Sequence, residues 1–548
     1  MRSAPAPLGR IVFGMLLVAL ALGVFFRIYH ADWKLYNPDE TNSSIRISGH
    51  TVKQVSHVIL DGKLHRVSEL AEFAVPTAET KPSDIWHSLA SEDPQHPPLF
   101  FLATFASERI TGDSIFFRRL PGLIFGLLAV WAAWWFGREL FGDAAPAWIL
   151  AALVAVSPFH VAFSQEAREY SFFLLATCAS SALLLAAVRT GNRLLLGGYA
   201  LSVALGCWGF TLFLVVVAAQ GLYAVLPVSG APFPRRLSAI VALVVGVLTF
   251  VPWLVNLAKN AGVAVNDTAW QATSLSAPLY AGKWLFNIGS AFFDLDYISL
   301  AWLPVVLLAL AIALVACVAF FRESPPRVWL LPVLIGAIPL LALLIPDVLK
   351  HETRALQSRY LTTTLLAIEI GTAGGLWSAL RNARGIGLLA GRAGLCVLLA
   401  CGVLSCAVSS QARTWWVTGQ QSMRAMPAIA DRLRQAGDAT IVYLADADDI
   451  LVLEPYSTPT MSFQLHQHLD DDALRSAAHP YAILSSEQMS HEPLASRMQR
   501  VPLVMSFEMR PDPAIDELRR RGAAARKLED NGRLDLGLYA LAPSATRP

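Results

Sequence analysis

The chain has 548 residues, of which 55% are hydrophobic and 15% charged, and its mean hydropathy is +0.49. Soluble globular proteins of this length are far less apolar, so we expect an integral membrane protein. The net charge is only +2 and the sequence has no basic stripe interleaved with aromatic residues, which argues against a nucleic-acid partner.

The apolar runs predict an all-α polytopic membrane protein. A helix needs about 20 mainly apolar residues to cross the hydrocarbon core. The run that follows Arg10 lacks a small-residue cleavage site after it, so we interpret it as an uncleaved first span. About 11 to 13 spans fit the sequence, and the eleven runs that we expect to cross are 10–29, 117–137, 145–163, 170–188, 193–207, 210–227, 237–256, 301–321, 327–346, 359–379 and 389–410.

Arginine residues predict the orientation of these spans, because positive loops stay in the cytoplasm. Arginines cluster at alternate span ends, which places the N-terminus inside. The outer segments are then 30–116, 164–169, 257–300, 347–358 and everything after 411. Residues 97–112, PPLFFLATFASERITG, are too short to cross comfortably, so we expect an interfacial or re-entrant helix there.

The composition changes abruptly near residue 411, which divides the chain into a membrane domain, 1–410, and an outer domain, 411–548. The outer domain is expected to be a small α/β domain. Its predicted helices are 423–437 and 512–522, and its predicted strands are TIVYLAD, YAILSS, VPLVMSF and LDLGLYAL.

Four outer segments carry polar residues that the membrane edge does not require, namely NPDETN, SEDPQHPPLFF, SPFHVAFSQEAREYSFF and DVLKHETRALQSRYL. Charged groups at this depth are costly unless they are paired or face water, so such clusters are candidate functional sites. A carboxylate can act as a general base, whereas arginines offer rigid donor forks for a phosphate. The acidic candidates, with one histidine, are Asp39, Glu40, Glu92, Asp93 and His96, and the basic segments offer Arg168, Tyr170, Arg354, Arg359 and Tyr360.

Each candidate also has a structural interpretation. Asp39 could cap a short helix that starts at Glu40 or Thr41. Arg168 could instead pair with Glu166 or Glu169, or anchor lipid headgroups.

The same alternatives apply to the remaining candidates. Arg354 and Arg359 could be headgroup anchors. His96 and His160 could be ordinary polar interface residues, and the run DDD at 470–472 could be a solvated helix start rather than a metal site.

Several motifs follow one another in an order that resembles a known protein family. An acidic pair in the first outer loop, then HPPLFF, FFRRLPGLIFGLLAVWAAWWFGRELFG, SPFHVAFSQEAREYSFFLLA and a late SRYLTTTLLA resemble the bacterial branch of the protein O-mannosyltransferase family. That family belongs to the GT-C glycosyltransferases, which also include the lipid A aminoarabinose transferases. The resemblance covers residues 35 to about 190 firmly and continues more weakly to about 375, and nothing beyond 411 is similar.

The resemblance implies roles for several residues. Asp39 matches the family's catalytic base and Glu40 its partner, while Glu92 or Asp93, beside His96, would be a second acid that contacts the acceptor or a metal. Arg168 with Tyr170, and Arg359 with Tyr360, would contact the donor phosphate. Many relatives carry a histidine and a tyrosine at the outer turn between 194 and 227, where this chain has GCWGFT, so a donor contact there is in doubt.

The resemblance implies a multi-pass enzyme of the bacterial inner membrane. It would transfer a monosaccharide from polyprenyl phosphate, such as undecaprenyl phosphate, to a hydroxyl of a protein, lipid or glycan on the outer face. No cofactor is certain; a divalent metal ion is an open option, with Asp39, Glu92 and Asp93 as its candidate ligands. Two rival interpretations are a transporter or flippase of lipid-linked sugars and a non-catalytic assembly protein on the same scaffold.

Overall fold

The computed structural model describes residues 9–59, 61, 63–267, 275–295, 300–350, 352–415, 417–418 and 431, and after these the short strands 440–443, 462–465, 481–484, 503–506, 524–530 and 537–542. The chain forms two compact units, which are described separately. The first comprises Met1–Asp32, Leu89–Ser107 and Phe116–Ala412, and the second comprises Trp33–Ser88, Glu108–Ile115 and Arg413–Pro548.

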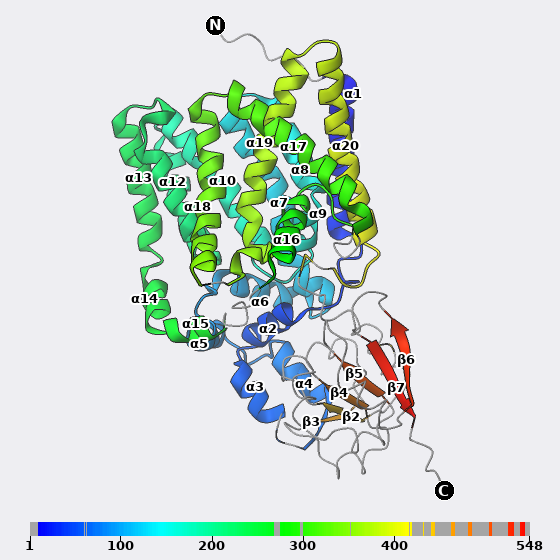
Figure 1. Ribbon diagram of the computed structural model, residues 1–548. Coiled ribbons are helices and arrows are strands. Elements are labelled where there is room, and N and C mark those ends of the chain that lie inside the picture. The colour runs from blue at the N-terminus through cyan, green and yellow to red at the C-terminus, as the bar shows by residue number, and fades with distance from the viewer. Residues whose placement is uncertain are drawn as a thin grey trace. The chain divides into compact units, whose positions relative to one another are not determined.

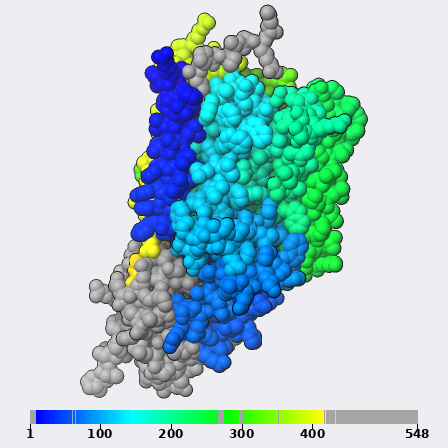
Figure 2. Space-filling view, turned by 180° about the vertical axis from the view of Figure 1, so that it is seen from behind, coloured from blue at the N-terminus to red at the C-terminus, as the bar shows by residue number. Residues whose placement is uncertain are grey.

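The first unit is a bundle of helices, and its long helices run side by side in Figure 1. The helix α1 (Arg10–Ile28) packs on α8 (Ala144–Val156) and α20 (Ile386–Ser409). The helix α19 (Thr362–Asn382) packs on α8 and α20 as well, and also on α17 (Leu303–Glu323) and α18 (Pro326–Lys350). Figure 2 shows the face on which the blue α1 lies along the cyan helices. The helices are α1 (Arg10–Ile28), α6 (Leu99–Thr111), α7 (Ile115–Phe141), α8 (Ala144–Val156), α9 (Pro158–Ser164), α10 (Tyr170–Thr190), α11 (Arg193–Gly209), α12 (Phe213–Val225), α13 (Phe233–Leu248), α14 (Val251–Lys259), α15 (Ala261–Asp267), α16 (Ala277–Gly289), α17 (Leu303–Glu323), α18 (Pro326–Lys350), α19 (Thr362–Asn382) and α20 (Ile386–Ser409), with short 3₁₀ turns η4 (Arg354–Leu356) and η5 (Ser358–Leu361).

By length and composition, six helices of the described chain can cross a membrane, or eight if each of two bent helix pairs is one span. The protein is therefore a multi-pass membrane protein. All eleven runs predicted as spans are helical, but α11 has 17 residues and α12 has 13, and α19 carries Glu369 and Arg381 within an otherwise apolar helix. The predicted interfacial segment forms α6, a helix of 13 residues that is not among the six.

The span predicted at 145–163 is broken into α8 and α9, which meet at an angle of 60°. Pro158 at the start of α9 lacks an N–H, so the last carbonyls of α8 need other donors. Arg27, fully buried on α1, donates from Nη1 to the Ala155 carbonyl and from Nη2 to the Val154 carbonyl, the latter at 3.0 Å. In the opposite direction, Gln165 Nε2 donates to the carbonyls of Phe26, at 2.8 Å, and Arg27, at 3.2 Å. The break is therefore a stable part of the fold.

Close helix contacts in this region require glycine. A Cβ on Gly23 of α1 would clash with the backbone of Ala155 on α8, and a Cβ on Gly126 of α7 would clash with the side chain of Ser164 on α9. Small residues allow membrane helices to approach closely, as they do here.

The second unit contains the first outer loop together with the tail of the chain. The loop forms α2 (Pro38–Ile47), α3 (Val52–Ile59), β1 (Leu64–Arg66), α4 (Val67–Ala74) and α5 (Pro82–Glu92), and α2 packs on α4. The described tail supplies β2 (Thr440–Tyr443), β3 (Ser462–Leu465), β4 (Tyr481–Leu484), β5 (Leu503–Ser506), β6 (Ala524–Asp530) and β7 (Gly537–Ala542).

These strands form one mixed sheet in the order β1-β3-β2-β4-β5-β7-β6. The strands β3, β2, β4 and β5 are parallel neighbours, whereas β1, β7 and β6 pair antiparallel. The loop strand β1 occupies the edge beside β3, with His65 opposite Phe463. The loop and the tail are joined a second time where Leu35 donates its N–H to the Arg413 carbonyl at 2.7 Å.

Four of the tail strands, β2, β4, β5 and β7, lie where the sequence predicts strands. The strands β3 and β6 are not predicted by the sequence pattern. Apart from Asp431, which is helical, the predicted helices of the tail and the acidic run 470–472 fall outside the described residues.

Candidate active site

The acidic pair of the first outer loop lies at the start of α2. The cap of this helix is Asn37, and the alternative that Asp39 is the cap is wrong. Asn37 Oδ1 accepts from the Glu40 N–H at 2.9 Å, and the Asn37 N–H donates to Glu40 Oε2 at 3.0 Å. Pro38 occupies the first helical position, where its missing N–H has no cost. The sequence NPDE is therefore a complete helix start.

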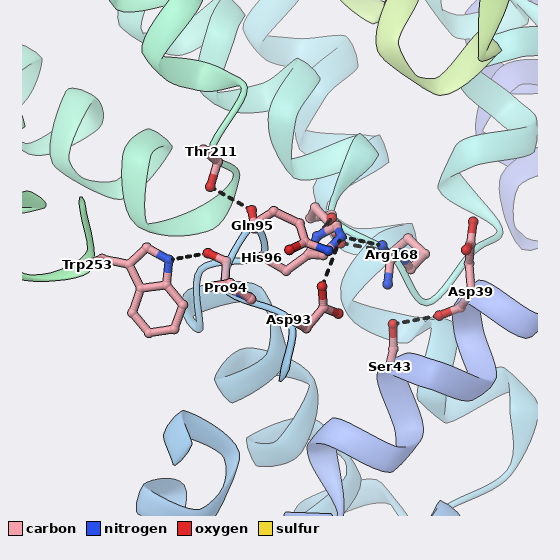
Figure 3. Close-up of polar contacts among 10 residues, drawn as sticks. Asp39, Ser43, Asp93, Pro94, Gln95, His96, Arg168, Thr211 and Trp253 are labelled. Carbon is pink, nitrogen blue, oxygen red and sulfur yellow. Dashed lines mark hydrogen bonds and ion pairs between the residues drawn. The ribbon is translucent and has the colours of Figure 1, made fainter. Parts of the chain in front are cut away.

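This cap gives the two acids different surroundings. Glu40 is fully buried and holds the backbone of Asn37, so its carboxylate has a structural task. Asp39 lies in the first turn, is partly exposed, and has its carbonyl oxygen held by Ser43 Oγ at 3.0 Å (Figure 3). The positive end of the helix dipole favours the ionised carboxylate at this position.

The second acidic segment, EDPQH, is fixed by hydrogen bonds to its backbone within the first unit. Trp253 Nε1 on α14 donates to the Pro94 carbonyl at 3.0 Å, and Thr211 Oγ1 between α11 and α12 donates to the Gln95 carbonyl at 2.6 Å (Figure 3). Asn256 Nδ2 donates to the Ala90 carbonyl at 3.1 Å. Two prolines follow His96, so this approach to α6 is irregular yet rigid.

Asp93 and His96 meet the arginine segment 165–170. Figure 3 shows Arg168 beside His96 and Asp93. His96 Nδ1 lies 2.7 Å from Glu169 Oε1, and because a carboxylate only accepts, the ring proton is assigned to Nδ1. Arg168 Nη2 then donates to His96 Nε2 at 3.3 Å, and Asp93 Oδ1 is 3.8 Å from the same nitrogen. The structure thus brings together four residues from two segments that are separated in the sequence.

Arg168 also pairs with Glu169, as the structural alternative proposed, with 3.5 Å between Arg168 Nε and Glu169 Oε2. Burial alone would raise the pKa of Glu169. The charge of Arg168, together with the hydrogen bond from His96, outweighs burial and lowers the pKa of Glu169 to about 2. Glu169 is consequently an anion throughout the physiological range.

The aromatic rings of Tyr170 and Phe210 contact this network. The guanidinium of Arg168 lies 5.8 Å from the centre of the Tyr170 ring, and Tyr170 meets Phe210 edge to face with 5.9 Å between ring centres. Phe210 also stacks on His96 at 6.5 Å. Phe210 and Thr211 belong to GCWGFT, where the sequence departs from the family pattern. Their contacts with the His96 segment were not predicted, because a single sequence gives no signal for a tertiary contact of this kind.

The second arginine segment lies in η4 and η5, between α18 and α19. Arg354 Nε is 2.9 Å from Glu352 Oε2, and Arg359 lies over the Tyr360 ring at 5.6 Å. Buried side chains hold its backbone: Asp347 Oδ2 accepts from the Ala355 N–H at 2.6 Å, and Asn287 Nδ2 donates to the Leu356 carbonyl at 2.8 Å.

Comparison with known proteins connects these features to a family. Residues 95–255 match the sequence model of the family described as dolichyl-phosphate-mannose-protein mannosyltransferase. The ArnT structure from Cupriavidus metallidurans in the apo state is similar over 98% of this chain and 100% of that chain, with 13% identity and a TM-score of 0.50. The fold is that of the GT-C glycosyltransferases.

Other similar GT-C structures include ArnT of the same organism bound to undecaprenyl phosphate, with 13% identity, a TM-score of 0.46 and 98% of both chains covered. The oligosaccharyltransferase AglB from Archaeoglobus fulgidus, in complex with an inhibitory peptide and a dolichol-phosphate, has 12% identity and a TM-score of 0.48, with 98% of this chain and 75% of that chain covered. A search of curated proteins found no match.

The resemblance to GT-C glycosyltransferases that the motifs indicated is confirmed. The family match contains His96, Arg168 and Tyr170, and it begins after Asp39 and ends before Arg359. The roles of all the candidate residues, and the convergence of Asp39 with the two arginines, stay predictions.

A metal site would need several ligand side chains close together. Among the residues that the structure describes, no group of three or more histidine, cysteine, aspartate or glutamate side chains is placed to hold a metal ion. Glu92 and Asp93, at 8% and 9% exposed, are buried at the end of α5. We therefore assign no chemical step to a metal.

Proposed function

We propose that this GT-C protein transfers a monosaccharide from a polyprenyl-phosphate donor to a hydroxyl acceptor at the outer face of the membrane. The observation that carries the proposal is the match of residues 95–255 to a family named for a polyprenyl-phosphate-linked sugar donor. That stretch contains the buried charged network of His96, Arg168 and Glu169. Such networks at the ends of membrane helices are functional sites by default.

The acceptor side of the reaction is assigned to Asp39. Its carboxylate takes the proton of the acceptor hydroxyl while the oxygen attacks the anomeric carbon, with inversion. Glu40 is occupied as part of the helix cap, which favours Asp39 as the base. Placing the base in the first turn of a capped helix fixes its backbone before the acceptor arrives.

The donor side is assigned to the arginines. As the new bond forms, the bond between the anomeric carbon and the phosphate oxygen breaks, and its electron pair stays on the phosphate. Arg168 and Arg359 offset this developing negative charge. The aromatic contacts with Tyr170 and Tyr360 restrict the rotamers of both guanidinium groups, which lowers the entropy lost on binding.

The large apolar surface of the helices suits the polyprenyl chain. The described helices expose many leucine, valine and phenylalanine side chains, as expected for surfaces that face lipid. We assign the protein to the inner membrane of a bacterium, as the resemblance to the bacterial branch of the family implies. The arginine distribution favours an N-terminus in the cytoplasm and a tail outside.

The experiment that tests the proposal is incubation of the purified protein in lipid nanodiscs with a small panel of polyprenyl-phosphate sugars. One donor should be consumed and a covalently glycosylated acceptor should appear. Asp39→Asn should lower the transfer rate by about 10²- to 10⁴-fold, the usual contribution of a general base. An Asp39→Asn protein with full activity would contradict the assignment.

Asp84→Asn is the matched control. Asp84 also lies in the first turn of a helix of the second unit, is also partly exposed, and accepts from the Lys81 N–H at 2.8 Å, a contact that asparagine can keep. Its activity should stay within about twofold of the wild type, because surface changes of this kind have small effects. Movement of a lipid-linked sugar across the membrane without any covalent product would replace the proposal by a transporter.

A further inference from the structure

A histidine and a glutamate form a buried pair in the first unit, outside the set of residues assigned to the substrates. His160 on α9 and Glu369 on α19 are 3.1 Å apart, between Nε2 and Oε2. Their side chains are 2% and 0% exposed. Ionisable residues inside a membrane protein are rare, and their presence calls for a reason.

His160 lies on a short helix that leads directly into the first arginine segment. The helix α9 ends at Ser164, and Arg168 follows four residues later. Ser164 Oγ donates to the His160 carbonyl at 2.6 Å, and Ser171 Oγ donates to the Phe163 carbonyl at 2.8 Å, so the segment is stiff on both sides of Arg168. A shift of α9 would therefore displace Arg168.

Glu369 lies on the helix that follows the second arginine segment. Arg359 is in η5, which ends at Leu361, and α19 begins at the next residue. About two helical turns separate this start from Glu369. The helix α19 follows η5 without an intervening loop. The position of α19 therefore determines the position of the Arg359 backbone.

The pair is poorly explained as a source of stability. Burying two ionisable groups costs desolvation energy, and well-packed apolar residues are often equally stable in such positions. Among the described residues, Glu369 Oε1 has no hydrogen-bond partner, so the pair does not satisfy all of its own polar atoms. A directional contact nevertheless fixes the register of two helices in a way that apolar packing does not.

We infer that His160 and Glu369 are positioning residues that set the distance between Arg168 and Arg359. This inference rests on the proposed function, in which both arginines hold the donor phosphate. The pair connects α9 and α19 shortly before the first arginine segment and about two helical turns after the second. Misplacement of catalytic groups by about 1 Å can cost about 10²-fold in rate.

The test is the double substitution His160→Leu with Glu369→Leu, studied in the full-length protein in nanodiscs. Glu369 also interacts electrostatically with the fully buried Arg27, so the thermal midpoint is measured first and all affinities are compared at a temperature where the variant is folded. We expect kcat/KM for the donor to fall by about tenfold or more, with most of the loss in KM, and the affinity for polyprenyl phosphate alone to fall in parallel. The conservative variant Glu369→Gln, which keeps an acceptor for His160, should recover most of the loss.

A matched control is the buried pair Tyr199 and Gln220, in which Tyr199 Oη donates to Gln220 Oε1 at 3.0 Å between α11 and α12. Both residues are fully buried, and neither helix carries one of the two arginines. Tyr199→Phe removes this bond, keeps the Gln220 Nε2 bonds to Ser180 and Ser181 of α10, and should leave the affinity for polyprenyl phosphate unchanged. An equal loss of affinity in this control would overturn the inference, since any buried polar pair would then have the same effect.

A double-mutant cycle with Arg359→Lys separates positioning from general structure. If the pair acts by placing Arg359, the leucine substitutions should cost much less in the Arg359→Lys background than in the wild type. Equal costs in both backgrounds would overturn the inference. A wild-type protein that binds polyprenyl phosphate but consumes no donor would contradict the proposed function, and the affinity measurements would still decide the role of the pair.

Discussion

The two arginine segments of the first unit have similar residues and different surroundings. In the segment 165–170, the side chains of Arg168 and Glu169 are 5% and 1% exposed, and His96 joins them from another part of the chain. In the segment 352–360, the side chains of Arg354 and Glu352, which pair with each other, are 27% and 13% exposed. The first segment therefore works in a low-dielectric environment where its geometry is fixed, whereas water weakens the charges of the second.

The largest expected effect is that of Arg168→Ala. The substitution leaves the buried Glu169 without its main counter-charge, and such a loss costs about 3–5 kcal/mol. We expect a clearly lower thermal midpoint in detergent and loss of donor consumption. A stable Arg168→Ala protein would contradict this difference between the segments, because it would show that the contacts of 165–170 are no more cooperative than those of 352–360.

The second largest effect is expected from acid, which should destabilise the network of His96, Arg168 and Glu169. The pKa of Glu169 is lowered to about 2, so its contribution to stability is present above the pKa of an unfolded glutamate, about 4.3, and is lost as the pH falls from there through about 2. The contribution at neutral pH is on the order of 3 kcal/mol. Unfolding measured between pH 7 and pH 3 should show this loss in the wild type and a smaller one in Glu169→Gln. Identical pH profiles for the two proteins would argue against the network.

Arg359→Ala tests whether the second arginine segment binds the donor without stabilising the fold. This residue is partly exposed, so the fold should tolerate its loss with little change in the thermal midpoint. The donor KM should rise about tenfold, which corresponds to about 1.4 kcal/mol. Arg359→Lys should retain part of the affinity because it keeps the charge but not the planar fork. An unchanged KM in both variants would remove Arg359 from the donor site.

The smallest effect is expected for Arg354→Ala. Its pair with Glu352 is partly exposed, and such pairs contribute about 0–1 kcal/mol. Thermal stability should change by no more than a few degrees, and raising the salt concentration should reduce the difference between variant and wild type. A loss as large as that of Arg168→Ala would show that the second segment is also a tightly built network.

The sequence predicts much of this fold because membrane helices follow from local composition. The apolar runs locate the helices of the bundle, and the short segment after His96 forms a helix of its own, α6. Local rules also explain the start of α2, although the cap turned out to be Asn37 rather than Asp39. The motifs were sufficient to indicate the GT-C fold.

The contacts that shape the site could not be predicted from local rules. The sequence left open whether Arg168 binds a ligand or pairs with Glu169, and it gave no sign that His96 joins them. Thr211 and Trp253 hold the backbone of the His96 segment, and a hydrogen bond to a backbone carbonyl does not depend on the identity of the accepting residue. Such contacts appear only when distant segments are brought together in three dimensions.

The pairing of β1 with β3 has a consequence for the biogenesis of the protein. The strand at 64–66 finds its partner at 462–465, so nearly the whole membrane bundle is synthesised between the two. Closing so long a loop is slow compared with the formation of local helices. The sheet that joins the loop of Asp39 to the tail is therefore completed only after residues 462–465 have been synthesised, and a chain truncated before them cannot pair β1 with β3.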